Sequence, residues 1–150
     1  MHVERLSPPD LSPDAYRAIR AVEGAVRAHG LPERLIELVK LRASQINGCA
    51  FCLDMHAGLL RRAGEPEQRL HVLAAWHDSP LFTAPERAAL AWTEALTRVA
   101  DTHAPEADYA PLREHFSDQE IVDLTILIGV INLWNRLAIG MRYVHDVAPA

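Results

Sequence analysis

The amino-acid sequence predicts an all-α fold, a bundle of about six helices, and three observations lead to that prediction. Apolar residues recur at three- and four-residue spacing, which places them on one face of a helix. Proline, glycine and N-cap residues divide the chain into segments of helical length. No segment shows the two-residue alternation of a strand. With 150 residues, the chain is expected to form one domain over residues 1–150.

Proline and glycine bound the first two expected helices. The first starts at Ser12-Pro13, with the serine as N-cap and the proline in the first turn, and it ends at Gly30. The second starts at Pro32 and carries an apolar stripe as far as Asn47-Gly48. That pair favours left-handed backbone, so the helix should end there.

Four further helical segments follow. The third helix is expected from Cys49 to Ala63, with Gly64 as its C-terminal cap, and the fourth from Glu65-Pro66 to near Trp76. The fifth and sixth are expected over residues 83–99 and 117–144, with one short helix between them at about 109–115. Each of these two long helices opens with a capping box, formed by Thr83 with Glu86 and by Ser117 with Glu120.

Charge and hydropathy exclude several classes of protein. The net charge of −5 leaves no basic surplus for binding a nucleic-acid backbone. The first ten residues show no basic stretch followed by an apolar run, so no secretory signal is predicted. The most apolar segment, residues 121–133, is too short and too polar for a bilayer span. We therefore expect a cytoplasmic protein with reduced thiols, in which a close cysteine pair indicates redox chemistry or metal binding.

The segment around the two cysteines carries the chemistry. Cys49, Cys52 and His56 are three and four residues apart, so on a helix their side chains share one face. A helix N-terminus lowers the pKa of a thiol, and a histidine one turn away can accept its proton. Glu37 lies on the preceding helix, where antiparallel packing would let its carboxylate orient His56. Glu37 could instead pair with Arg34 or Arg42.

This arrangement predicts a peroxide-reducing cycle. A thiolate attacks the O–O bond, becomes a sulfenic acid and condenses with the neighbouring thiol to a disulfide. The sequence leaves open which cysteine attacks first. The helix dipole favours Cys49, whereas the adjacent base favours Cys52, and the second effect carries more weight because it removes a proton from the attacking thiol.

Zinc binding is the main alternative from a different class. Cys49, Cys52 and His56 would need a fourth ligand, which Glu37, His71 or His77 could supply. A structural zinc site usually brings a second paired knuckle, which this chain lacks.

Three polar residues of the last helix share one face and are expected to form a structural network or a subunit contact: Asn132, Asn135 and Arg136.

The pattern Glu-x11-Cys-x2-Cys-x3-His, at Glu37, Cys49, Cys52 and His56, resembles the alkylhydroperoxidase AhpD core of the carboxymuconolactone decarboxylase family. The segments that also resemble its members are 41–49, 86–95 and 131–136, and together they cover most of residues 20–143. The four-residue pattern is specific, whereas a lone C-x-x-C pair would not be.

The resemblance implies roles for these residues. In the family's peroxidases the second cysteine is peroxidatic and the first resolves, which corresponds to Cys52 and Cys49 here. The histidine and the glutamate, His56 and Glu37, form a proton relay. Members are helical and assemble as homo-oligomers, often trimers or hexamers, and the peroxidases need no metal or organic cofactor. Decarboxylase members typically lack the cysteine pair, so the pair favours the peroxidase branch.

The predicted function is therefore a peroxiredoxin-type thiol peroxidase that reduces hydroperoxides in antioxidant defence. Its reductant would be an external dithiol, either a lipoyl protein or a thioredoxin-like protein. The best-studied branch uses a lipoylated acyltransferase subunit, and this chain differs from it in carrying Ala50-Phe51 where a histidine can stand. A general thiol–disulfide oxidoreductase, a zinc-stabilised binding module and a lyase are the alternatives.

Overall fold

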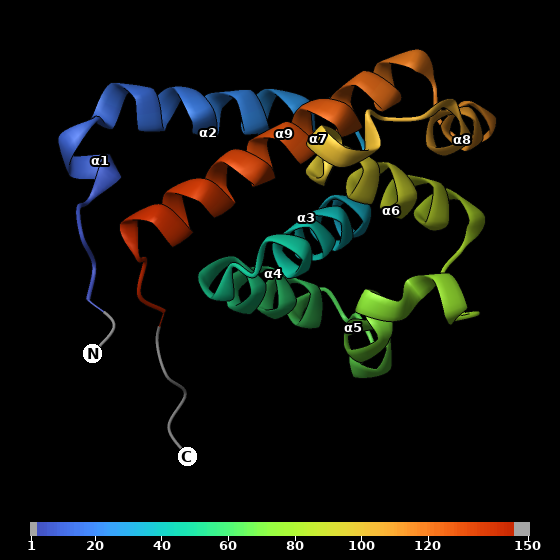
Figure 1. Cartoon of the computed structure of the whole chain (residues 1–150), viewed down its shortest axis with the longest axis horizontal. Coiled ribbons are helices and arrows are strands. Elements are labelled where there is room, and N and C mark those ends of the chain that lie inside the picture. Colours follow the sequence, from blue (N-terminus) through green and yellow to red (C-terminus); the bar gives the residue numbers. More distant parts are fainter. Residues whose placement is uncertain (1–2, 146–150) are drawn as a thin grey trace.

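The computed structural model describes residues 3–145, and within that range it contains helices and turns but no strand (Figure 1). The all-α prediction is thus confirmed. The elements are α1 (Pro8–Leu11), α2 (Pro13–Arg27), α3 (Glu33–Asn47), α4 (Ala50–Arg62), α5 (Glu67–Val72), the 3-10 helix η1 (Leu73–Asp78), α6 (Ala84–Thr97), α7 (Val99–Thr102), α8 (Glu106–Tyr109), the 3-10 helix η2 (Ala110–Glu114) and α9 (Asp118–Met141).

Helix α3 is the central element of the fold, because it packs against α4, α6 and α9 (Figure 1). It is buried over most of its length, from Leu35 to Ser44. One hydrophobic cluster joins it to α6 and α9 through residues such as Val39, Trp92 and Leu127. A second cluster joins it to α4, α5 and η1 through residues such as Leu38 and Leu60. Burial of these side chains, at about 25 cal/mol per Å² of apolar surface, holds these helices together around α3.

The two predicted capping boxes are present. Thr83 and Ser117 each accept a hydrogen bond from the backbone N–H of the glutamate three residues later, and each glutamate accepts one in return. The prediction for Ser12 is wrong in one respect, because its side chain makes no capping hydrogen bond. Ser12 also ends the short helix α1, where its N–H donates to the Pro8 carbonyl.

Several boundaries differ from the predicted ones. The last helix ends at Met141 rather than near residue 144, because Arg142 adopts a left-handed conformation with φ of 58°. The predicted fourth helix divides into α5 and η1, with non-helical backbone at Ala75. The short helix expected at 109–115 is the pair α8 and η2, which starts earlier, at Glu106. Two helices of one turn each, α1 and α7, were not predicted.

A tight turn between α3 and α4 delivers the first cysteine to its place. Gly48 has a φ of 69°, a left-handed conformation that costs glycine little. Its N–H donates to the Gln45 carbonyl, and the Cys49 N–H donates to the Ser44 carbonyl, which together make a Schellman motif. Cys49 is therefore both the residue that completes the end of α3 and the N-cap of α4.

Helix α9 is long and apolar enough to cross a bilayer by length and composition alone, which corrects the expectation drawn from residues 121–133. Its packing is that of a core helix, since it contacts α2, α3, α4 and α6. Its buried polar side chains find partners within the chain, as when Asn135 donates to the Ser44 hydroxyl over 3.0 Å.

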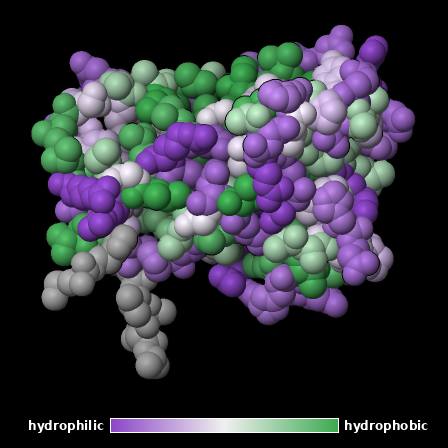
Figure 2. Space-filling model, in the orientation of Figure 1, coloured by the Kyte–Doolittle hydropathy of each residue, from purple (hydrophilic) through white to green (hydrophobic). Residues whose placement is uncertain are grey.

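Figure 2 shows hydrophilic side chains over much of the face drawn, interrupted by smaller hydrophobic patches.

Candidate active site

The two cysteines lie at the start of α4 and are bonded to each other as a disulfide. Their Cα atoms are 5.3 Å apart, which is the separation expected when both sulfur atoms lie on one helical turn. The Cys49 sulfur also accepts a hydrogen bond from the Cys52 N–H over 3.3 Å, so it caps the helix. Both residues are almost completely buried, with 1% and 2% of their surface exposed.

His56 follows one turn after Cys52 and is held by Glu37. The Nδ1 atom of His56 lies 2.6 Å from Oε2 of Glu37, and the two residues are 2% and 4% exposed. This contact pairs a residue of α3 with one of α4, as antiparallel packing across the turn at Gly48 requires. The other ring nitrogen, Nε2, is buried and has no hydrogen-bond partner in the part of the chain that the structure describes.

Glu37 is kept ionised by two partners. Burial by itself raises the pKa of this carboxyl, but the hydrogen bonds from His56 and Arg27 outweigh it and lower the pKa to about 2. Arg27 donates through Nη2 to the second oxygen of Glu37 over 2.5 Å. With both oxygens occupied, the carboxylate cannot rotate, so it holds the imidazole ring in one orientation.

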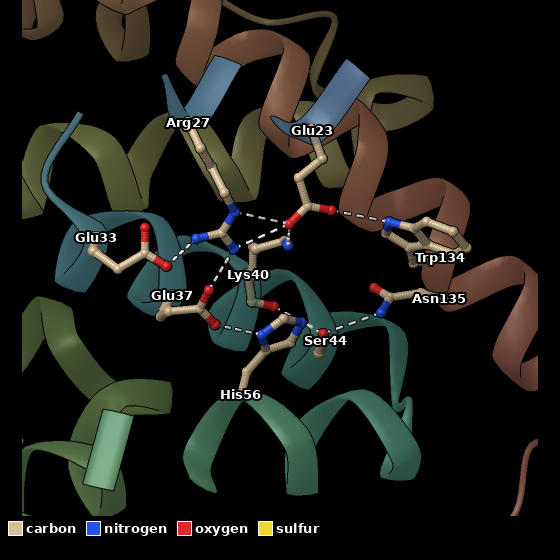
Figure 3. Close-up of polar contacts among 9 residues, drawn as sticks. All are labelled: Glu23, Arg27, Glu33, Glu37, Lys40, Ser44, His56, Trp134 and Asn135. Atoms are coloured by element: carbon tan, nitrogen blue, oxygen red, sulfur yellow. Dashed lines mark hydrogen bonds and ion pairs between the residues drawn. The ribbon is translucent and has the colours of Figure 1, made fainter. Parts of the chain in front are cut away.

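A wider charge network surrounds this pair (Figure 3). Arg27 also bonds to Glu23 over 3.0 Å, and Glu23 forms an ion pair with Lys40, which is only 3% exposed. The second oxygen of Glu23 accepts a hydrogen bond from the Trp134 indole over 3.2 Å. A buried lysine needs such a partner, because an unpaired charge in the interior is costly. The network thereby ties α2 to α3 and α9.

Stability should fall in acid as Glu37 loses its charge. A carboxyl with a folded-state pKa of about 2 and an ordinary value of 4.5 stabilises the fold above pH 4.5, and loses that contribution as the pH falls toward 2. We expect the difference in unfolding free energy between the native protein and Glu37→Gln to shrink over this range by about 2–3 kcal/mol. Urea unfolding of both proteins at several pH values measures it. A difference independent of pH would contradict the assignment.

A cavity of about 440 Å³ opens beside the second cysteine. Cys52 and His56 line it, whereas Cys49 does not. The remaining walls come from α2, α3, α4, α9 and the residues just after α9. Apolar and aromatic side chains such as Phe51, Met55 and Trp134 make up most of them, and four charged side chains also line the cavity: Arg20, Glu23, Arg27 and Lys40. An incoming molecule in this cavity would therefore meet Cys52 rather than Cys49.

The structure brings the four predicted site residues together, but several residues that were considered as their partners lie elsewhere. Arg34 and Arg42, considered as partners of Glu37, pair with Glu65 and Glu94 instead. The two histidines considered as zinc ligands are exposed and pair with glutamates elsewhere, His71 with Glu67 and His77 with Glu94. Among residues 3–145 no group of three histidine, cysteine or acidic residues is arranged to hold a metal.

Sequence reasoning did not find Arg27, Glu23 or Lys40. Lys40 is the sole lysine of the chain, and its place within the buried stripe of α3 was the signal that could have pointed to a paired interior charge. The predicted polar face of α9 is a structural network, as expected. The Asn47 side chain donates to the side-chain oxygens of both Asn132 and Asn135, over 3.0 and 2.8 Å.

Comparison with known proteins shows the family and the fold of this chain. The model of the carboxymuconolactone decarboxylase family matches residues 13–95. The uncharacterized protein YdfG of Bacillus subtilis is 36% identical over 92% of this chain and 94% of its own length. A solved structure from Agrobacterium tumefaciens, of a protein of unknown function named as a candidate antioxidant defence protein AhpD, is 47% identical with a TM-score of 0.93. It covers 97% of this chain and 100% of its own.

The chain belongs to the carboxymuconolactone decarboxylase family and has the AhpD-like fold. The fold itself extends to other chemistry. The debrominase Bmp8 has a TM-score of 0.76 at 18% identity, over 89% of this chain and 72% of its own. The reaction of this protein must therefore be argued from its own site rather than from the fold.

Proposed function

We propose that this protein is a thiol peroxidase that reduces organic hydroperoxides, with Cys52 as the attacking residue. The observation that carries the proposal is the cavity shared by Cys52 and His56, into which Cys49 does not reach. The Nε2 atom of His56 has no hydrogen-bond partner among residues 3–145, and Glu37 holds the other ring nitrogen, Nδ1. Such a histidine can accept the proton of the Cys52 thiol, and the thiol thereby becomes the reactive thiolate.

The first step consumes the hydroperoxide. The Cys52 thiolate attacks the terminal oxygen of ROOH, the O–O bond breaks, and the remaining oxygen leaves as an alkoxide. The proton taken from the thiol by His56 passes to that alkoxide and gives the alcohol ROH. Cys52 is oxidised to a sulfenic acid and the peroxide is reduced.

The second step forms the disulfide that the structure contains. The Cys49 thiol attacks the sulfenic sulfur, water leaves, and the S–S bond closes within the first turn of α4. An external dithiol then reduces this bond and takes up the oxidising equivalents, which returns both thiols. We propose a lipoyl protein or a thioredoxin-like protein as its source, and the cytoplasm as the compartment, because dithiol pools are kept reduced there.

The lining of the cavity supports an organic substrate. Phe51, Met55, Leu59 and Trp134 offer apolar surface to an alkyl or aryl group, which hydrogen peroxide lacks. We therefore expect cumene hydroperoxide to oxidise the reduced protein faster than hydrogen peroxide does.

Mass spectrometry of the reduced protein after one equivalent of cumene hydroperoxide tests the proposal. Loss of two hydrogen atoms and formation of the Cys49–Cys52 disulfide are expected. Slow reaction with peroxide, together with fast exchange with dithiols, would instead assign a general thiol–disulfide oxidoreductase. An unreactive protein that carries stoichiometric zinc would refute the thiol chemistry and assign a metal-binding module.

We also propose that the protein assembles as a homo-oligomer, a trimer or hexamer, through α9. Val122, Ile126 and Leu133 share one face of this helix and are 57%, 38% and 39% exposed. A cavity of about 430 Å³ between α6 and α9 extends that face, with Leu96 and Val99 in its wall. Apolar area of this kind is typical of an interface. Sedimentation velocity tests it, and a monomer at every concentration would contradict it.

A further inference from the structure

The C-terminal end of α9 places an aromatic residue beside the cysteines. The Arg142 N–H donates to the Ile139 carbonyl, and the Tyr143 N–H donates to the Ala138 carbonyl, which makes a Schellman motif around the left-handed Arg142. The N-terminal segment secures this end, because Arg5 bonds through backbone and side chain to the carbonyls of Met141 and Gly140. The conformation of Tyr143 is therefore held from both sides.

The Tyr143 ring packs directly on the redox pair. It lies against the cluster of Cys49, Cys52 and Ala138, and it makes an edge-to-face contact with Phe51 at 5.3 Å between ring centroids. It also lines the cavity that Cys52 and His56 share. Two Schellman motifs thus bring their last residues, Cys49 and Tyr143, from distant positions in the sequence to one place.

The hydroxyl group of Tyr143 is buried, and no group in the described residues meets hydrogen-bond geometry with it. Leaving a buried hydroxyl unpaired costs about 1–3 kcal/mol, so a phenylalanine would be the better residue if only packing mattered. The Nε2 atom of His56 is the other buried side-chain N or O atom without a partner in this part of the chain, and His56 is one of the residues that line the same cavity. Two unpaired polar groups around one thiol indicate a bound molecule that can hydrogen-bond to both.

We propose that Tyr143 is a further catalytic residue, whose hydroxyl donates a hydrogen bond to the hydroperoxide oxygen that leaves when the O–O bond breaks. The inference rests on the proposed peroxidase function and adds a group that neither the cysteine motif nor the proton relay contains. Negative charge develops on the departing oxygen in the transition state, and a fixed donor in a buried site stabilises it. The proton that completes the alcohol is still the one His56 removed from Cys52, so the phenol is unchanged at the end of the step.

The phenol keeps its proton under ordinary conditions, as a donor must. Burial is the largest cause that raises the pKa of Tyr143 to about 12, and Glu4 and Tyr16 act in the same direction. Tyr16 lies near the phenol oxygen but outside hydrogen-bond geometry. Tyr16 lies on α2 and lines the same cavity. Its ring contacts Trp134 edge-to-face, with 5.0 Å between the ring centroids.

The Tyr143→Phe variant tests the proposal, with Tyr109→Phe as the matched control. Phenylalanine preserves the ring that packs on Phe51 and removes only the hydroxyl, and Tyr109 lies away from this cavity, against Trp92. The oxidation rate of reduced Tyr143→Phe by cumene hydroperoxide is expected to fall by roughly 100-fold, the effect of losing one donor to a developing oxyanion. Alkylation of Cys52 by iodoacetamide should be unchanged, and the thermal midpoint should not fall. Tyr109→Phe should oxidise at the native rate.

The outcomes separate this inference from the function on which it rests. Equal oxidation rates in the native protein and Tyr143→Phe would overturn the role of Tyr143 and leave the peroxidase intact. A parallel loss of alkylation and peroxide reactivity would also overturn it, since Tyr143 would then act on the thiol or on the fold. If the native protein itself did not react with peroxide, both proposals would fall.

Discussion

Replacing Cys52 with serine should abolish the reaction with hydroperoxide, whereas replacing Cys49 should leave the first step intact. Cys52 lines the cavity together with His56, whereas Cys49 is buried and does not line it. Loss of the attacking sulfur is expected to lower the oxidation rate by roughly 1000-fold or more, as for other catalytic nucleophiles. Cys49→Ser should consume one equivalent of peroxide and then stop.

Trapping with dimedone followed by mass spectrometry measures this difference. The sulfenic acid on Cys52 should accumulate in Cys49→Ser because its resolving partner is missing. The two variants control for each other, since each removes one sulfur from the same turn. A sulfenic acid that forms only in Cys52→Ser would preserve the peroxidase and exchange the two roles.

His56→Asn should have the second-largest effect. Asparagine can still donate to Glu37 from near the position of Nδ1, but it lacks the Nε2 atom, which is the proposed proton acceptor. Losing a general base typically lowers a rate by about 10²–10⁴-fold, and we expect a loss in that range near neutral pH. The rate of the variant should recover as the pH rises past about 8.5, where an unassisted thiol ionises by itself.

Stopped-flow oxidation of reduced protein over a range of pH checks this prediction. His71→Asn is the matched control, because His71 is exposed on α5, pairs with Glu67 and does not line the cavity. A native rate in His56→Asn, or a loss that persists at high pH, would show that His56 does not deprotonate the thiol.

Much of the fold could be predicted because its signals are local. The capping boxes at Thr83 and Ser117 act through backbone groups within three residues, and Gly48 ends α3 through its own φ angle. The end of α9 could not be predicted in this way. Arg142 takes a left-handed conformation without being glycine, and the contacts of Arg5 with that end of the helix come from the far end of the sequence.

The residues of the candidate site also fall into two groups: those that local sequence signals predict, and those that only the tertiary structure brings to the site. The spacing of Cys49, Cys52 and His56 places them on one face of any helix, and Glu37 followed from antiparallel packing of neighbouring helices. Arg27 could not be predicted as the second partner of Glu37, because Arg34 and Arg42 were closer in sequence. In the structure those two arginines pair with Glu65, between α4 and α5, and with Glu94 of α6.

By itself, the sequence determined the helical class, most helix starts and the grouping of the two thiols with a histidine. These depend on capping and on the 3.6-residue turn, which act within a few positions of the chain. Only the tertiary structure decided which thiol faces the cavity, which cations accompany Glu37, and that Tyr143 lies beside the cysteines. The physical reason is that a buried charge or hydroxyl is satisfied by whichever helix packs against it, and that choice is made by the core as a whole.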